Sequence, residues 1–312
     1  MRASRDSWYS GSLLPSQSTS IIATITRLHW DGIHTMPRVS VIVSHFDRQS
    51  LLLQALDSIA GQSYRDFEVI VVNDHGADSR FLVEDFAARV ARSGSPVRVR
   101  YDYRPTNAGV AATRNRGVAL ASGEFIAYLD DDDLWRPSHL RGLVGLLDAR
   151  PDCGLAYGDA EIWRMEWRAS REAGADIDSG WRTAATRTLA TPFDGVELKR
   201  NDYIVPGGML HRRALYEAIG PFDETLYVSD DWDWLLRASA VSTFVRLPQV
   251  VVTVRIWPDG ANLSAKINSR RLAALAQIER RYQTPPLEPK TFWEVAETLG
   301  QRSTDGTMHV IS

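Results

Sequence analysis

The chain of 312 residues carries a formal net charge of −3, so it lacks the basic field that favours nucleic acid as a partner. Its single cysteine, Cys153, excludes an internal disulfide and suits a reducing compartment. No uninterrupted apolar stretch approaches the ~20 residues that a membrane-spanning helix needs. These features predict a cytoplasmic globular protein that binds no nucleic acid, with enough length for one large domain or two small ones.

Residues 1–36 differ in composition from everything that follows. They are rich in Ser, Thr and Arg, and their one apolar patch, 21–25, is too short and too far from the start for a signal peptide. We expect a disordered N-terminal tail over 1–36. A native start at Met36 is a further hypothesis, because Pro37 and Arg38 lead directly into the first predicted strand.

From Val39 on, predicted strands alternate with predicted helices. Continuous apolar runs, and one alternating run, predict strands at residues 39–43, 67–72, 97–103 and 124–129. Apolar side chains at helical spacing predict helices at about 51–60, 79–90, 110–121 and 137–149, with Ser50 and Asp78 as caps of the first two. Such alternation predicts an α/β fold with a mostly parallel sheet that helices flank on both faces.

Four consecutive carboxylates, Asp130 to Asp133, follow the strand predicted at 124–129. Adjacent anions repel one another, so a folded chain keeps them together where a positive charge offsets them. A hard divalent cation such as Mg²⁺ or Mn²⁺ prefers oxygen ligands and often bridges to substrate phosphates. The other interpretation is an acidic turn that caps the next helix, with Asp133 near the helix start and Pro137 in its first turn.

Polar side chains also follow the other predicted strands. Asp47, Asp74 and Asn107 each lie just after a strand or in the loop that succeeds it. Ligands of parallel sheets bind beyond the carboxyl ends of the strands, so these residues and the four aspartates are expected to converge. Helix capping does not explain that convergence.

Several motifs carry a resemblance to a known family. They lie at residues 39–48, 69–78, 107–109, 114–117, 125–135, 220–224 and 230–237. With them, roughly residues 38 to 255 resemble the family 2 glycosyltransferases of the GT-A fold. The resemblance implies a Rossmann-like sheet and an inverting, metal-dependent transferase that uses Mg²⁺ or Mn²⁺. It also implies a nucleotide-diphospho-sugar as donor, and a UDP-sugar is the expected one.

The resemblance also assigns roles to residues. Asp130 and Asp132 match the metal-binding Asp-x-Asp pair, and Asp231 matches the catalytic base. Asp74 matches the carboxylate that usually reads the base of the nucleotide. The residues expected to contact the nucleotide-sugar are Asp47, Asp74, Asn107, Arg114, Asp130 and Asp131, with Asp132 close to the diphosphate.

The residue types fit that chemistry, but local alternatives exist. A cation offsets the charge of a diphosphate leaving group, and inversion needs a base on the opposite face of the sugar. Asp231 begins the helix predicted at 230–240, where capping is the alternative role. Arg114 is either a solvated helix residue or a guanidinium that binds a phosphate or a pair of aspartates.

We predict a GT-A domain over 37–255, divided into a nucleotide-sugar half at 37–135 and an acceptor half at 136–255, followed by a helical extension at 256–312. Residues 159–200 show little periodicity and are either an acceptor-side insertion or a surface excursion. The basic amphipathic helix at 264–282 either packs on its own domain or rests on an anionic membrane. Trp257 stands where the family often has a histidine.

The predicted function is sugar transfer to a glycan or lipid-linked acceptor in polysaccharide or cell-envelope glycan synthesis, in the cytoplasm or at the inner face of the membrane. A nucleotidyltransferase is expected to have a glycine-rich loop after the first strand, but residues 44–48 contain no glycine. A dehydrogenase is disfavoured because no Gly-x-Gly-x-x-Gly motif follows a strand. A catalytically inactive glycan-binding protein of the same fold is the other open alternative.

Overall fold

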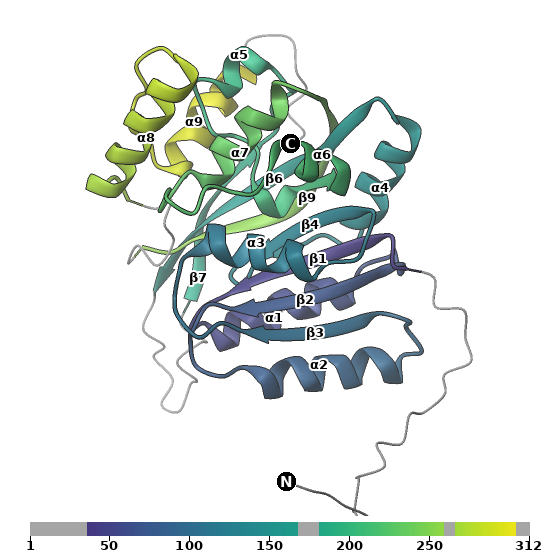
Figure 1. Cartoon of the computed structure of the whole chain (residues 1–312). Helices are drawn as coiled ribbons and strands as arrows, with labels where there is room; N and C mark the ends of the chain where they lie inside the picture. The colour runs from purple at the N-terminus through teal and green to yellow at the C-terminus, as the bar shows by residue number, and fades with distance from the viewer. Residues whose placement is uncertain (1–35, 168–180, 259–265, 304–312) are drawn as a thin grey trace, which may run out of the picture. The chain divides into compact units, whose positions relative to one another are not determined.

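A nine-stranded sheet runs through the part of the chain that this computed structural model describes, residues 36–167, 181–258 and 266–303 (Figure 1). Its strands lie in the order β3-β2-β1-β4-β8-β6-β9-β5, and β7 pairs with β6 outside this path. From Met36 on, these residues form one compact unit. The tail predicted at 1–36 lies outside the described residues, apart from Met36.

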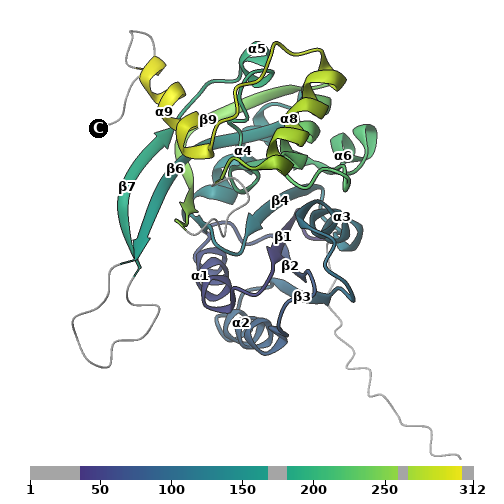
Figure 2. The same ribbon diagram turned by 90° about the vertical axis from the view of Figure 1, so that its left-hand side faces the viewer.

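The first half of the sheet is parallel. Its strands are β1 (Val39–His45), β2 (Phe67–Asn73), β3 (Arg98–Tyr103) and β4 (Phe125–Asp130). The helices α1 (Gln49–Ala60) and α2 (Arg80–Arg92) cover one face and α3 (Val110–Leu120) covers the other (Figure 2). Both faces of β1 and β2 are therefore buried, as their continuous apolar sequences indicate. The predicted α/β fold is confirmed.

The caps of the first two helices differ from the prediction. α1 begins at Gln49, with Arg48 rather than Ser50 at the N-cap position. α2 begins after Ser79, although the Asp78 carboxylate still accepts a hydrogen bond of 2.9 Å from the Arg80 backbone N–H. α1 therefore begins two residues before its expected start and α2 one residue after it, which is the usual spread of helix boundaries.

The second half of the unit adds antiparallel strand pairs, which the sequence did not predict, although a strand was expected at 250–254, within β9. Its elements are β5 (Leu134–Trp135), α4 (His139–Ala149), β6 (Cys153–Trp167), β7 (Trp181–Leu189), α5 (Gly195–Leu198), η2 (Pro206–Gly208), β8 (Met209–Arg212), α6 (Arg213–Ile219), α7 (Asp230–Ser239) and β9 (Thr243–Ile256). Within the segment of little periodicity, β6 and β7 pair antiparallel. A register shift between Arg164 and Met165 breaks their alternation, which hides the strands from a search for period two.

The C-terminal helices pack on the same core as the sheet. α8 (Ser269–Tyr282) and α9 (Phe292–Ser303) contribute Leu275, Ile278 and Val295 to the main cluster of buried apolar residues. β9 continues through residue 255 to Ile256, so no break in the sheet marks the predicted start of the extension. Among the described residues, no helix is both long and apolar enough to cross a membrane.

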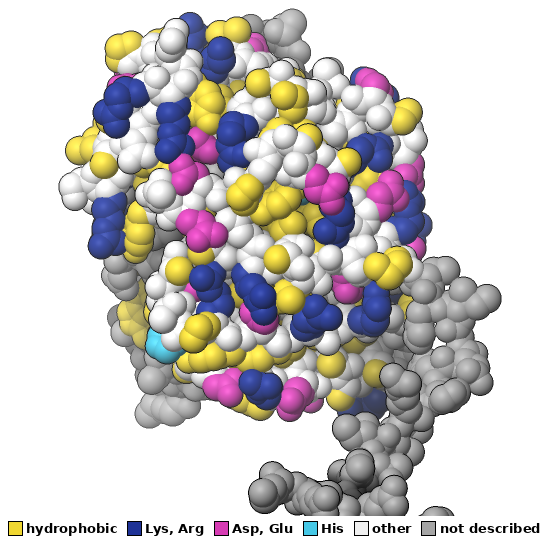
Figure 3. All heavy atoms as spheres, viewed as in Figure 1, with side chains coloured by type: hydrophobic (Ala, Val, Ile, Leu, Met, Phe, Trp, Pro, Cys, Tyr) yellow, Lys and Arg dark blue, Asp and Glu magenta, His cyan; other side chains and the backbone are white. Residues whose placement is uncertain are grey.

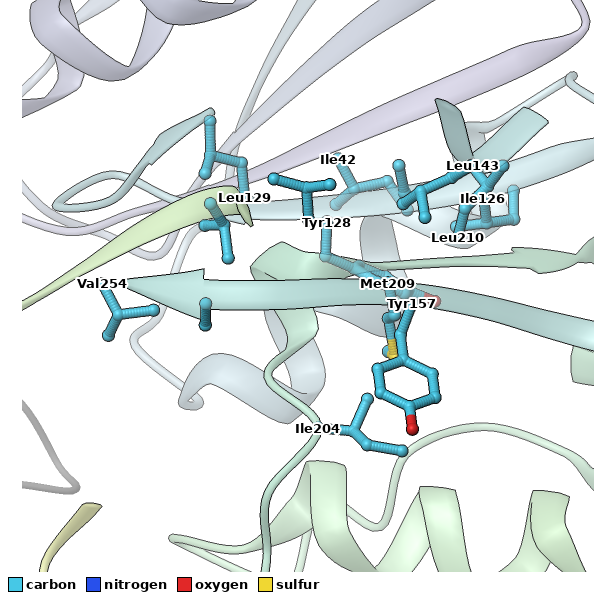
Figure 4. Packing of buried hydrophobic residues seen from close by; sticks show 14 of the residues in the cluster. Ile42, Ile126, Tyr128, Leu129, Leu143, Tyr157, Ile204, Met209, Leu210 and Val254 are labelled. Atoms are coloured by element: carbon cyan, nitrogen blue, oxygen red, sulfur yellow. The ribbon is translucent and has the colours of Figure 1, made fainter. Parts of the chain in front are cut away.

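The core joins the two halves of the sheet at β4. Ile126, Tyr128 and Leu129 of β4 lie among residues of β1, α4, β6 and β8 in the close view of Figure 4. The Tyr128 hydroxyl lies 2.9 Å from Nε2 of His211, so two buried polar groups satisfy each other. This packing fixes the end of β4, where the acidic run begins.

Gly123 offers a test of the turn that leads into β4. A Cβ atom at Gly123 would lie 2.6 Å from the Ser40 backbone nitrogen, whereas one at Gly145, on the exposed side of α4, would meet nothing within 4 Å. Gly123→Ala should therefore lower the free energy of unfolding by about 1–3 kcal/mol. Gly145→Ala should leave it unchanged or raise it by up to about 1 kcal/mol. Urea denaturation measures both, and equal effects would contradict this account of the turn.

Candidate active site

A cavity of about 600 Å³ lies at the carboxyl ends of β1, β2 and β4, with α7, α8 and α9 supplying residues on its other side. That volume lies within the range of small-molecule sites. Seven of the residues predicted for the site line it: Asp47, Asp74, Asn107, Arg114, Asp130, Asp132 and Asp231. The convergence expected from the parallel strands therefore occurs.

Asp47 joins the loops after β1 and β2, and Asp74 joins the end of β2 to the start of α3. Asp47 adopts a positive φ of 53°, and its Oδ1 accepts a hydrogen bond of 2.6 Å from the Ala77 backbone N–H. The Asp74 carboxylate accepts from the backbone N–H of Gly109 at 2.7 Å and of Ala108 at 3.1 Å. Asp74 therefore anchors the start of α3 as well as facing the cavity, while Asn107 is exposed at its rim.

Asp131 lies beneath the cavity rather than in its wall. Its side chain is fully buried, with Oδ2 2.7 Å from Nδ1 of His45 and Oδ1 2.6 Å from the Arg48 guanidinium. Nε2 of His45 in turn lies 2.7 Å from the Ser79 hydroxyl. This network ties the acidic run to the first turns of α1 and α2. A nucleotide contact for Asp131 stays a prediction, and the contacts present give it a positioning role.

Asp132 and Asp133 are held by one arginine from each side. Arg48 pairs with Asp132 at 2.6 Å and is therefore bidentate across Asp131 and Asp132. The Arg255 backbone N–H donates to Asp133 at 3.1 Å, and its guanidinium bonds the Asp132 backbone carbonyl. Asp133 does not cap the next helix, because α4 begins only at His139, so the capping interpretation of the acidic run is wrong.

Arg114 is buried between two aspartates from different parts of the chain. Its guanidinium lies 3.1 Å from Asp130 and 2.9 Å from Asp230, and the side chain is 4% exposed. It is therefore not a solvated helix residue. A fork that spans two carboxylates links the acidic run of β4 to the start of α7.

The three acidic residues in the first turn of α7 have different environments. Asp230 pairs with Arg114, while Asp233 pairs with Arg237 at 3.0 Å and Arg281 at 3.0 Å. Asp231 is the one of the three that is partly exposed, and it faces the cavity. Ser229, with a positive φ of 62°, occupies the N-cap position without a side-chain cap. The Asp231 Oδ1 atom accepts a hydrogen bond of 2.9 Å from the Trp232 backbone N–H, so Asp231 binds one of the free N–H groups of the first turn as well as lining the cavity.

Burial makes the acidic cluster sensitive to protons. It raises the pKa of Asp132 to about 7 although Arg48 opposes the shift, and it raises the pKa of Asp230 to about 7 against Arg114. The pKa of Asp133 is likewise raised well above its usual range by burial. Burial therefore disfavours the ionised form of these carboxylates more than the nearby arginines favour it.

Residues that the sequence did not single out complete the wall beside Asp231. Asp202, Arg271 and Phe292 line the cavity there. Burial, and then the charge of Asp231, raise the pKa of Asp202 well above its usual range. No local pattern marks Asp202. Arg271, however, occupies the same helical stripe as the buried Ala274, Leu275 and Ile278, and that spacing is a signal in the sequence.

Comparison with known proteins agrees with this architecture. The family profile described as "Glycosyl transferase family 2" matches residues 40–218. The uncharacterized glycosyltransferase YwdF of Bacillus subtilis (strain 168) is 28% identical over 263 residues, which cover 82% of this chain and 88% of the relative. A PGL/p-HBAD biosynthesis glycosyltransferase of Mycobacterium bovis (strain BCG / Pasteur 1173P2) is 28% identical over 218 residues, which cover 69% of this chain and 75% of the relative.

A solved structure shares the fold. The mannosyltransferase PcManGT from Pyrobaculum calidifontis, in complex with GDP-Man and Mn²⁺, matches with a TM-score of 0.59 and 21% identity over 87% of this chain and 71% of its own. At that identity the likeness concerns the fold alone. The expected GT-A architecture is confirmed.

The Arg114 bridge can be tested against a neighbour on the same helix. Arg114→Met leaves Asp130 and Asp230 without their shared partner, so at pH 8 it should lower the free energy of unfolding by about 3–5 kcal/mol. Arg116 pairs with Asp102 at 2.7 Å but is 47% exposed, so Arg116→Met should cost about 1 kcal/mol or less. Chemical denaturation compares the two variants. Similar losses would contradict a buried, bridging role for Arg114.

Proposed function

Because this chain belongs to glycosyl transferase family 2, we propose that it is an inverting, metal-dependent glycosyltransferase that moves a sugar from a nucleotide-diphospho-sugar to an acceptor hydroxyl. The observation that carries the proposal is the placement of Asp130, Asp132 and Asp231 around one cavity. Arg114 fixes their spacing, since it bonds Asp130 directly and Asp230, the neighbour of Asp231.

The charge balance supports a divalent cation. Asp130 to Asp133 and Asp230 are five carboxylates, and the guanidinium groups of Arg48 and Arg114 pair with four of them. Asp133 accepts from the Arg255 backbone N–H instead. The carboxylates therefore outnumber the guanidinium groups that pair with them, which favours a further positive group such as Mg²⁺ or Mn²⁺. Fully ionised, the cluster is therefore incomplete without a further positive group, which is consistent with the raised pKa values of Asp132 and Asp230.

Asp130 and Asp132 are the proposed ligands. In the described part of the chain, no group of three or more His, Cys, Asp or Glu side chains is arranged to hold a metal. We therefore propose that these two carboxylates share the cation with the phosphate oxygens of the sugar nucleotide, as is usual for Mg²⁺. When bound, the cation offsets the negative charge that develops on the diphosphate leaving group.

On the other wall, Asp231 is the proposed general base. Its carboxylate would take the proton of the acceptor hydroxyl as that oxygen attacks the sugar carbon. Its neighbours Asp230 and Asp233 are buried and pair with arginines, whereas Asp231 is partly exposed and lines the cavity. Asp47, Asp74 and Asn107 would contact the nucleoside at the ends of β1 and β2.

A UDP-sugar is the donor we propose, with a glycan or lipid-linked acceptor in cell-envelope glycan or glycolipid synthesis. The Mycobacterium relative, described as a biosynthesis glycosyltransferase, supports this class. The solved mannosyltransferase holds GDP-Man, so GDP-sugars belong in the same screen as UDP-sugars. Mn²⁺-dependent release of the nucleoside diphosphate is the measurement, and release from neither group of sugars would contradict the proposal.

The two carboxylate roles separate experimentally. Asp132→Asn removes a proposed metal ligand, so Mn²⁺-dependent nucleotide binding and sugar transfer should fall together. Asp231 is proposed to act only on the acceptor, so Asp231→Asn should leave nucleotide binding nearly unchanged. Sugar transfer should fall roughly 10²–10⁴-fold. Calorimetric titration with Mn²⁺ and nucleoside diphosphate, run beside a transfer assay, distinguishes the two. Loss of nucleotide binding in Asp231→Asn, with transfer surviving in Asp132→Asn, would reverse the assignment.

Peripheral membrane contact through 264–282 is a further part of the proposal; residues 264 and 265 lie outside the described structure. In α8 and the residues just before it, Ile267 and Leu272 are 45% and 47% exposed, and Arg270 and Arg280 are also exposed. Figure 3 shows the dark blue Lys and Arg side chains interspersed with yellow apolar ones over α8, at the upper left.

That mixture of exposed apolar and basic side chains suits an anionic lipid surface. Co-sedimentation with anionic vesicles should therefore be seen at low salt and should decline as salt rises, because exposed charges are screened over about 8–10 Å at physiological ionic strength. Neutral vesicles are the control. Absence of binding to anionic vesicles even at low salt would contradict the membrane contact and indicate that α8 has a purely structural role.

A further inference from the structure

Arg271 is turned into the cavity by the way α8 begins. The Asn268 side chain caps the helix by accepting a 3.0 Å hydrogen bond from the Arg271 backbone N–H. This places Arg271 in the first turn, on the stripe that packs against the protein, and the residue is only 8% exposed. Its neighbour Arg270 points outward and lies over the Tyr227 ring at 4.1 Å.

Part of the hydrogen-bonding capacity of the buried Arg271 guanidinium is unused in the described part of the chain. Its Nε atom has no hydrogen-bond acceptor in the described part of the chain. Burial lowers the pKa of Arg271, while the charges of Asp202, Asp231 and Glu294 act in the opposite direction from farther away. Arg48 and Arg114, in the same cavity, each bond carboxylates directly. A buried cation that lacks such contacts destabilises the free protein, so a ligand is expected to supply them.

The chemistry of the missing partner follows from the group. A guanidinium fork binds the oxygens of phosphate or carboxylate through paired, charge-assisted hydrogen bonds. The N-terminus of α8, a helix of 14 residues, adds a positive electrostatic potential at the same place. Both features favour an oxyanion.

The position identifies which reactant would carry that oxyanion. The charges that act on Arg271 belong to Asp202, Asp231 and Glu294, whereas Asp130 to Asp133 act on Arg48. Arg271 therefore acts on the proposed base Asp231, whereas the carboxylates proposed to hold the metal already pair with Arg48 and Arg114. A group bound there belongs to the acceptor rather than to the sugar nucleotide.

We propose that Arg271 forms an anion-binding subsite for the acceptor and contacts a phosphate or carboxylate close to the hydroxyl that receives the sugar. The assignment to the acceptor rests on the proposed transferase function, but the anion site itself does not. Asp202 and Asp231 would disfavour an anion that approached them directly. The subsite therefore selects acceptors whose anionic group reaches Arg271 while the hydroxyl faces Asp231.

Inorganic phosphate is the probe for the site itself. It is titrated into the full chain in EDTA, so that no cation can hold phosphate at Asp130 and Asp132, and sodium chloride keeps the ionic strength constant. At about ten times its Kd, phosphate should raise the Tm of the unaltered chain by roughly 2–3 °C. Arg271→Met should lose that shift, whereas Arg270→Met, altered at the adjacent outward-pointing residue, should keep it.

Acetate is titrated in parallel, because the anionic group of the acceptor is either a phosphate or a carboxylate. The anion that gives the larger shift in Tm indicates which of the two groups the acceptor carries. No shift in the unaltered chain, or an equal shift in Arg271→Met, would overturn the proposal.

Because Met keeps the volume and removes an uncompensated charge, Arg271→Met should be at least as stable as the unaltered chain without phosphate. A marked loss of Tm there would instead indicate a structural role. If Arg271→Met fails to fold, Arg271→Lys, which lacks the fork, should bind phosphate several-fold more weakly.

A second measurement keeps this proposal separate from the transferase assignment. The second measurement uses a sugar nucleotide that the chain turns over. Arg271→Met should keep the nucleotide affinity of the unaltered chain, and it should also keep the unaltered chain's slow rate of sugar transfer to water. For an anionic acceptor its KM should rise roughly 10- to 100-fold, the usual effect of losing a charge-assisted contact. Loss of transfer to water as well would place Arg271 on the donor and overturn the proposal. If no sugar nucleotide binds at all, the transferase function fails while the phosphate result stands on its own.

Discussion

Four consecutive carboxylates at the end of β4 are the constraint on which the rest of the site depends. Three arginines from three elements stabilise them: Arg48 before α1, Arg114 in α3 and Arg255 in β9. Because a buried carboxylate without its partner is strongly unfavourable, these contacts fix the positions of α1, α3 and β9 around the end of β4. The acidic run therefore organises the fold of the site as well as its chemistry.

The same constraint explains why the site stays reactive. The arginines hold the acids in place, but burial still raises the pKa of Asp132 and of Asp230 to about 7. A purely structural cluster would be better served by full compensation, or by apolar residues of similar volume. Incomplete compensation at a cavity wall is the pattern expected of a site that binds a cation together with its substrate.

The sequence predicts the parallel half well and the second half poorly, for a physical reason. Buried parallel strands have continuous apolar sequences, and their ends must meet, so the positions of Asp47, Asp74 and Asp130 follow from local patterns. The pairing of β6 with β7, β8 and β9 depends on distant partners, and the bulge after Arg164 removes even the alternation. The burial of Arg114 and Asp131 is likewise set by residues far along the chain, which no local window contains.

The position of a residue around the axis of α8 decides whether its side chain is buried or exposed, as the adjacent Arg270 and Arg271 show. Successive residues of a helix are turned by about 100°, so Arg270 and Arg271 reach different surroundings although the sequence reads only as a basic pair. Farther along α8, Arg281 bonds Asp223 at 2.6 Å and Asp233 at 3.0 Å, on either side of the turn that carries Asp231. The segment predicted as an extension of the domain thus supplies one wall of the cavity and holds the loop of the proposed base. A unit that ended at residue 255 would lack the cavity residues Arg271 and Phe292 and the contacts of Arg281.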